Sequence, residues 1–278
     1  MKSIYWFRND LRVDDNLSLN EAIESSDEIL FVYIQDVKNL NDTEWKFTRM
    51  DSHRKLYISQ GLNALQERLG SYGHSLNYYL GDTVGGLNNL VKKFQIDRIY
   101  CESIDSHEEL DEEKRLRDHK IDLYSLYQSG LFLNDQIPFH LNDLPDVFTK
   151  FRKDIELRNI NPIKPSLVNE KINAIISIVD EESITFNLQQ KDYSKSSFPI
   201  SENRFFGGED KGFKYLESYF SSNKPATYKK TRNELMGTGF STKFSPWLAT
   251  GYISARQVYD FLLSYESNVI KNESTYWI

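Results

Sequence analysis

The first 130 residues of this sequence predict an α/β fold with a doubly wound parallel sheet of five strands. Short apolar runs alternate with longer segments in which apolar residues recur every three or four positions, as in buried strands and amphipathic helices. This alternation predicts a parallel sheet, because each parallel connection needs a crossover long enough to hold a helix. Helices are therefore expected on both faces of the sheet.

Each predicted strand is a run of mostly apolar residues with polar or glycine residues on either side. The only cysteine, Cys101, ends the fourth run. We expect it to fill a buried position, because an unpaired cysteine behaves as a small hydrophobic residue. The five strands are expected at residues 3–7, 28–34, 76–80, 98–101 and 123–127.

The predicted helices of this region begin at capping residues. Asp14 and Asp15 stand before the first helix, and Asp51 stands before the longest one, which we expect to end near Gly70. Capping explains the Asp14–Asp15 pair better than acid–base catalysis does. Two further helices are expected at residues 83–94 and 107–117.

The regular alternation fades after about residue 130. Five prolines punctuate residues 131–200, which predicts a long connector between two structured regions. Helical spacing returns in residues 201–278, where Ser254 is expected to cap a helix. The sequence thus divides into an α/β domain at 1–130, a connector at 131–200 and a helical region at 201–278. Helices in the second and third parts are expected near residues 147–157, 212–219 and 255–265.

The composition limits the class of protein and its partners. A net charge of −7 argues against indiscriminate nucleic-acid binding, although residues 201–278 hold ten Lys/Arg and eight Asp/Glu and so carry +2. A single cysteine excludes an internal disulfide and indicates a reducing compartment. No stretch approaches the roughly 20 apolar residues of a membrane span, the start shows no secretory signal, and the histidines lack metal-ligand spacing. A soluble cytoplasmic protein without a metal is expected.

A cluster of hydroxyl groups and one lysine lies directly before a predicted helix start. Ser241, Thr242 and Ser245 surround Lys243, and Ser245 is expected to cap the helix with Pro246 at its first position. First-turn N–H groups and a nearby cation favour an anion, so this stretch is expected to bind a phosphate. It differs from the phosphate loop of nucleotide triphosphatases, whose Gly-Lys-Ser/Thr ending is absent. A turn that only caps the helix is the alternative.

Five segments along the chain carry a family resemblance: residues 6–16 (WFRNDLRVDDN), 144–156 (LPDVFTKFRKDIE), 206–209 (FGGE), 228–251 (YKKTRNELMGTGFSTKFSPWLATG) and 272–277 (NESTYW). Together they resemble the photolyase and cryptochrome family, and most closely its DASH branch. The resemblance implies a Rossmann-like photolyase amino-terminal domain of the antenna type at 1–130. The connector and the first part of an all-helical FAD-binding domain would follow. The apolar ending Tyr276-Trp277-Ile278 is expected to mark a truncated member.

The resemblance also implies a function. It implies FAD as cofactor, 5,10-methenyltetrahydrofolate as an antenna pigment and damaged DNA as partner. The complete protein would use blue light to repair cyclobutane pyrimidine dimers, preferably in single-stranded DNA, where flipping the lesion costs less unpairing. A blue-light photoreceptor without repair, or a truncated α/β module without catalysis, are the alternatives. The isolated chain is expected to retain little or no FAD.

The resemblance assigns roles to specific residues. Arg232 matches a position that faces DNA phosphate, with a solvated helix arginine as the alternative. Glu108 and Glu109 lie near the folate position, with a solvated acidic face as the alternative. The residues that hold the flavin ring, bind the lesion and relay electrons are expected beyond Ile278, so no catalytic residue is named. The expected contacts to the flavin phosphates are Tyr228, Ser241, Thr242, Lys243, Phe244 and Ser245.

Overall fold

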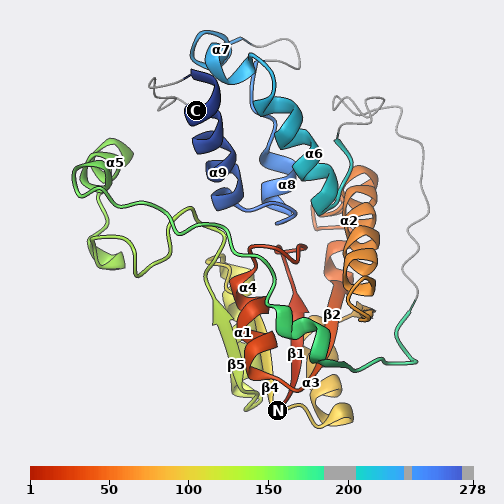
Figure 1. Cartoon of the computed structure of the whole chain (residues 1–278). Coiled ribbons are helices and arrows are strands. Elements are labelled where there is room, and N and C mark those ends of the chain that lie inside the picture. The colour runs from red at the N-terminus through yellow and green to blue at the C-terminus, as the bar shows by residue number, and fades with distance from the viewer. Residues whose placement is uncertain (185–204, 235–239, 271–278) are drawn as a thin grey trace.

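The computed structural model describes residues 1–184, 205–234 and 240–270, and its centre is a parallel β-sheet (Figure 1). The long strands run side by side in the order β3-β2-β1-β4-β5. The chain builds outward from β1 to β3, then crosses back to β4 and β5, which confirms the predicted doubly wound arrangement. These strands are β1 (Lys2–Phe7), β2 (Glu28–Asp36), β3 (Leu76–Gly81), β4 (Arg98–Glu102) and β5 (Leu123–Leu126).

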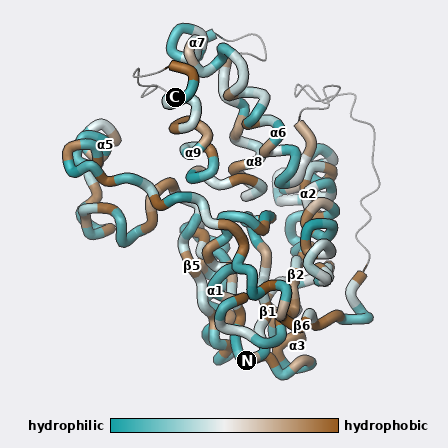
Figure 2. The backbone as a smooth tube through the Cα atoms, in the orientation of Figure 1, coloured by the Kyte–Doolittle hydropathy of each residue, from teal (hydrophilic) through white to brown (hydrophobic). Residues whose placement is uncertain are grey.

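A sixth short strand, β6 (Ile176–Ser177), was not predicted. It pairs in parallel with Glu28 and Ile29 of β2, whereas the pairing of β2 with β3 starts only at Phe31. The connector therefore returns to the sheet and uses backbone groups that β3 leaves open. Figure 2 shows this hydrophobic segment beside the sheet. Two residues are too few to give a periodic signal, so the sequence pattern could not reveal the strand.

Helices cover both faces of the sheet because side chains alternate along each strand. Tyr5 and Phe7 of β1 face a core shared with α1 and α2, and Ile4 and Trp6 face a second core shared with α3 and α4. Helix α5 lies in the connector, and α6 to α9 follow it. The helices are α1 (Leu17–Ser25), α2 (Ser52–Gly70), α3 (Thr83–Phe94), α4 (His107–Asp118), α5 (Phe148–Leu157), α6 (Glu209–Phe220), α7 (Lys224–Thr231), α8 (Ser245–Ala249) and α9 (Ala255–Tyr265).

The helices α6, α8 and α9 lie beyond the carboxyl ends of the strands (Figure 1). The core on the α1 and α2 face continues into them without a break. Trp247 of α8 is its largest fully buried side chain. The Trp247 ring lies 4.8 Å from the ring of Tyr215, and its indole N–H donates to the Phe206 carbonyl at 3.0 Å. Helix α8 is therefore fixed to the surrounding core through Trp247, its central residue.

Two predicted caps are wrong. Asn16, and not Asp14 or Asp15, caps α1, because its side-chain oxygen accepts the Leu19 N–H at 3.1 Å. Ser245 is the first residue of α8 and makes no capping bond, so Pro246 follows at the second position. The Ser254 cap of α9 is confirmed, with a reciprocal bond to Gln257.

The segment at 272–277 that carries the family resemblance lies outside the described residues, as does part of the predicted connector. In the ranges that are described, no helix combines the length and the apolar character needed to cross a membrane.

Candidate functional site

The phosphate-binding stretch expected from the sequence forms a bend at residues 240–245, immediately before α8. Lys243 has a φ of 58°, in the left-handed region that few residues other than glycine adopt. The backbone N–H groups of residues 241–245 make no hydrogen bond to another described residue. The amides of Trp247 and Leu248, in contrast, both donate to the Phe244 carbonyl at 3.1 Å. With respect to the described residues, the amides of 241–245 are therefore unpaired, whereas those of Trp247 and Leu248 are paired.

Phe244 anchors the bend to the helical layer. Its side chain is only 4% exposed and lies 5.0 Å from the ring of Tyr219 and 6.0 Å from that of Phe220. Only its backbone can therefore reach a ligand. Ser241, Thr242 and Lys243 are partly exposed and Ser245 is exposed. Buried and accessible residues thus lie next to each other in the bend, so its donors have a fixed support.

Tyr228 lies on α7 and is half-buried beside the same aromatic cluster. Burial raises the pKa of the Tyr219 hydroxyl well above its ordinary value, and the neighbouring Tyr228 hydroxyl raises it further. Tyr219 thus touches Phe244 on one side and lies near Tyr228 on the other, which brings α7 and the bend together. Arg232 is exposed at the carboxyl end of α7, where its backbone N–H donates to the Tyr228 carbonyl at 2.8 Å.

This donor set fits a phosphate group. Unpaired N–H groups, hydroxyl groups and one ammonium group all interact favourably with anionic oxygens. The α8 dipole contributes little, because the helix has only the five residues Ser245–Ala249. Within the ranges described here, no group of three His, Cys, Asp or Glu side chains could hold a metal ion. The donors of the bend are therefore backbone N–H groups, hydroxyl groups and one lysine side chain.

Glu108 and Glu109 lie in the first turn of α4. Glu108 accepts two hydrogen bonds from Arg49, at 2.7 and 2.6 Å, and these bonds lower the pKa of its carboxyl group. Glu109 accepts from the Ser106 hydroxyl. Both glutamates border a cavity of 120 Å³ at the carboxyl end of β1 and β2. That volume is below the roughly 300–1,000 Å³ typical of small-molecule pockets, so a folate does not fit the cavity as formed here.

Two ion pairs lie beside this cavity. Arg8 pairs with Glu113 at 2.8 Å, and Lys38 pairs with Glu112 at 2.6 Å. The carboxyl edge of a doubly wound sheet is where such folds commonly bind ligands. Here that edge is occupied by the protein's own charged side chains, which the sequence analysis did not foresee.

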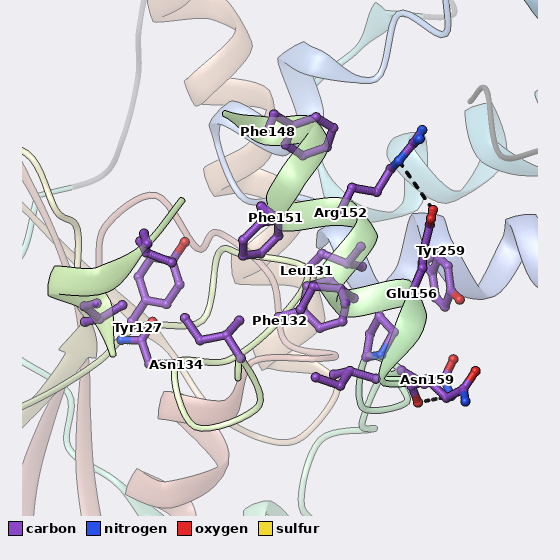
Figure 3. A pocket seen from close by; sticks show the side chains of 18 of the residues that line it. Tyr127, Leu131, Phe132, Asn134, Phe148, Phe151, Arg152, Glu156, Asn159 and Tyr259 are labelled. Atoms are coloured by element: carbon purple, nitrogen blue, oxygen red, sulfur yellow. Dashed lines mark hydrogen bonds and ion pairs between the residues drawn. The ribbon is translucent and has the colours of Figure 1, made fainter. Parts of the chain in front are cut away.

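A larger cavity of 790 Å³ lies between the connector and α9. Its wall is mainly aromatic and aliphatic and includes Phe148 and Phe151 of α5 together with Phe132 and Tyr259 (Figure 3). Arg152, also on this wall, pairs with Glu156 on its own helix at 3.4 Å. No residue of the bend lines this cavity, so the cavity is separate from the bend.

A buried polar joint behind α8 could not be predicted from the sequence. Asp15 of the loop after β1 forms an ion pair with Arg256 at 3.0 Å, and it accepts a hydrogen bond from the Ser254 hydroxyl. Arg12 of the same loop donates to the Gly251 carbonyl at 3.1 Å. Charged residues so far apart in sequence give no local pattern, and Asp14 and Asp15 are also plausible helix caps.

A doubly wound α/β sheet that feeds into a layer of helices defines the class of protein. The chain belongs to the DNA photolyase family, whose sequence model, "DNA photolyase", matches residues 3–167. Within that family it is similar to proteins named cryptochrome DASH. The one from Idiomarina loihiensis is 32% identical over 281 residues, and the one from Synechocystis sp. is 32% identical over 284 residues.

These alignments cover 99% of this chain, but 60% and 57% of the two relatives, so the chain spans less than two thirds of their length. The crystal structure of the Synechocystis cryptochrome superimposes with a TM-score of 0.84 at 31% identity, covering 100% of this chain and 58% of that one. An archaeal photolyase from Sulfolobus tokodaii, whose crystal structure holds two FAD molecules, shares the fold, with a TM-score of 0.71 at 20% identity. That comparison covers 100% of this chain and 57% of the archaeal one.

Proposed function

We propose that this chain is part of a DASH-type photolyase-like flavoprotein that binds the pyrophosphate of FAD at the bend. The observation that carries the proposal is the run of N–H groups at residues 241–245 that find no partner in the described ranges, beside the Lys243 ammonium group. A pyrophosphate offers oxygen acceptors to the N–H groups and negative charge to the Lys243 ammonium group. Similarity to cryptochrome DASH along 99% of the chain supports a flavin over other phosphate ligands.

Each residue of the bend has its own part in this proposal. Lys243 offsets the phosphate charge, and the hydroxyl groups of Ser241, Thr242 and Ser245 donate beside the backbone N–H groups. Phe244 contributes its backbone N–H and holds the bend through its buried ring. Tyr228 donates its hydroxyl from α7. Bound FAD supplies light absorption and electron transfer, whereas the protein binds and orients it.

The activity that we propose is blue-light repair of cyclobutane pyrimidine dimers, preferably in single-stranded DNA. Arg232 supports a DNA contact because it is exposed next to Tyr228, on the α7 end of the site. A single strand suits a protein of net charge −7, because a local cation contacts the backbone and no base pair has to open. We place the protein in the cytoplasm, where the single buried thiol of Cys101 stays reduced.

An FAD titration of the purified protein tests the cofactor proposal. We expect little FAD to remain through purification, but added FAD or ADP to bind measurably. Lys243→Gln should weaken that binding about tenfold, equivalent to about 1.4 kcal/mol, because it removes the only cation of the bend. Lys214→Gln, at an exposed lysine of α6, is the matched control. Equal affinities for wild type and Lys243→Gln would exclude the bend as the phosphate site.

Illumination then separates the proposed activity from its alternatives. The FAD-loaded protein is exposed to blue light with an oligonucleotide that carries one thymine dimer, in single-stranded or in duplex form. Loss of the dimer in the single strand supports repair. Flavin photoreduction without dimer loss indicates a photoreceptor. A colourless protein that takes up no FAD indicates a module without catalysis.

A folate antenna at Glu108 and Glu109 stays a prediction. Binding there requires the Arg49–Glu108 contact to open, because the cavity has only 120 Å³ and both carboxylates already accept hydrogen bonds. A fluorescence titration with 5,10-methenyltetrahydrofolate tests the site. The absence of any uptake would remove the folate from the function.

A further inference from the structure

The loop that follows β1 is in direct contact with the turn that follows α8 (Figure 1). The Leu11 N–H donates to the Thr250 carbonyl at 3.3 Å. Gly251, with a φ of 66°, lies so close to the loop that a Cβ atom there would be 1.8 Å from the Asn9 carbonyl oxygen. No side chain fits between the two backbones. The α/β layer therefore touches the exit of α8 at backbone level.

Arg12 joins this loop to the turn. Its side chain is 2% exposed, and Nη1 donates to the Gly251 carbonyl at 3.1 Å. Nε and Nη2 donate to the Asp15 carbonyl of its own loop, at 3.2 and 2.9 Å. One guanidinium group thus satisfies buried carbonyls on both sides of the joint. The planar guanidinium group suits this bridging role, and a lysine at this position could form only some of these hydrogen bonds.

A second contact fixes the chain just after the turn. Arg256 pairs with Asp15 and also donates to the carbonyls of Gln128 and Gly130, at 2.9 and 3.2 Å. The start of α9 is therefore fastened to the loop after β1 and to the segment after β5. The exit of α8 has little freedom to move.

Helix α8 transmits this restraint to the bend. It contains only Ser245–Ala249, and about 7 Å of helix separates its two ends at a rise of about 1.5 Å per residue. Trp247, fully buried in its middle, prevents the helix from rotating about its axis. Because no flexible segment lies between them, we expect a shift at Gly251 to be transmitted to residues 241–245 at the other end.

We propose that Arg12 is a positioning residue for the bend. Through Gly251 it sets the carboxyl end of α8 and thereby aims the N–H groups of residues 241–245, which it does not touch. Only one expected consequence of this role, a lower affinity for FAD, rests on the proposed function. The positioning itself can be measured without any ligand.

The test uses Arg12→Met, which keeps the side-chain stem and removes every donor. Arg12→Lys restores the charge and one donor. Arg68→Met is the matched control. Arg68 also contacts this loop, through an ion pair with Asp14 at 3.2 Å, but its side chain is partly exposed to solvent. Amide hydrogen exchange is followed at Trp247, Leu248 and Tyr252 of the α8 segment and, for comparison, along β1. Affinities for FAD and for ADP are measured on the same proteins.

Arg12→Met should accelerate exchange in the α8 segment at least tenfold with β1 unchanged, and should weaken FAD and ADP at least fivefold. Arg12→Lys should recover part of both effects, and Arg68→Met should match wild type. Unchanged exchange at α8, or an equal acceleration along β1, would overturn the proposal. If Arg12→Met does not fold, the same measurements on Arg12→Lys decide. Wild type that binds neither ligand, with α8 exchange still altered in the variant, would refute the FAD function but support the positioning role.

Discussion

The carboxylate of Asp15 and the guanidinium group of Arg256 lie 3.0 Å apart, and both side chains are completely inaccessible to solvent. Asp15 belongs to the loop after β1, and Arg256 belongs to the first turn of α9, 241 residues later. The pair therefore connects the α/β layer to the helical layer through the interior. Such a pair is costly to break from one side, since the remaining charge stays buried without its partner.

Asp15→Ala should lower the free energy of unfolding by about 3–5 kcal/mol, the range for removing one partner of a buried ion pair. Glu156→Ala, which breaks the exposed Arg152–Glu156 pair on α5, should leave the free energy of unfolding nearly unchanged. Urea unfolding followed by circular dichroism measures both. If the two variants lose similar amounts, the buried pair does not hold the layers together.

Glu209 gives the protein a dependence on pH. Its carboxylate accepts the N–H groups of Val13 and Asp14, both at 3.1 Å, and burial raises its pKa from 4.5 to about 7. An acid whose pKa is raised by folding binds its proton more tightly in the folded state. Its stabilising contribution is therefore complete below pH 4.5 and is lost as the pH rises through 7.

Glu209→Gln should remove that contribution to the pH dependence. Between pH 4.5 and pH 7 the free energy of unfolding of the wild type should fall by on the order of 3 kcal/mol because of this group, at about 1.36 kcal/mol per pKa unit. The variant should show a correspondingly flatter profile in urea unfolding across the same range. A variant with the slope of the wild type would mean that another group titrates there.

Phe244 should be far more important for stability than Phe148. Phe244 is 4% exposed and Phe148 is 74% exposed. Truncation of a buried phenylalanine costs about 3–5 kcal/mol, so Phe244→Ala should lower the midpoint of thermal unfolding strongly and Phe148→Ala only slightly. Similar midpoints for both variants would show that the ring of Phe244 does not support the bend.

The long strands could be predicted from the sequence because each is a local apolar run with polar boundaries. Strand β6 could not, because its two residues pair with β2 only through the return of the connector. The caps show the same limit. Asp14, Asp15 and Asn16 are all plausible capping residues, and contacts from distant residues decide which one caps α1.

The chemistry of the bend was also local, since hydroxyl groups and a lysine stand together in the sequence. The contacts that hold the bend in place are not local in the sequence. Phe244 was expected to contact a ligand, yet its ring is buried against Tyr219 of α6. The role of Arg12 depends on Gly251, which lies 239 residues away. Contacts of this kind leave no periodic trace in the sequence, so only the folded structure reveals them.

The close approach of Gly251 to Asn9 has a consequence for recombining this protein with its relatives. A chimera that joins the sheet of one parent to the helices of another would bring together two backbone surfaces that had not been selected to match. Segments 8–16 and 250–256 should therefore be inherited from the same parent, wherever the crossover is placed.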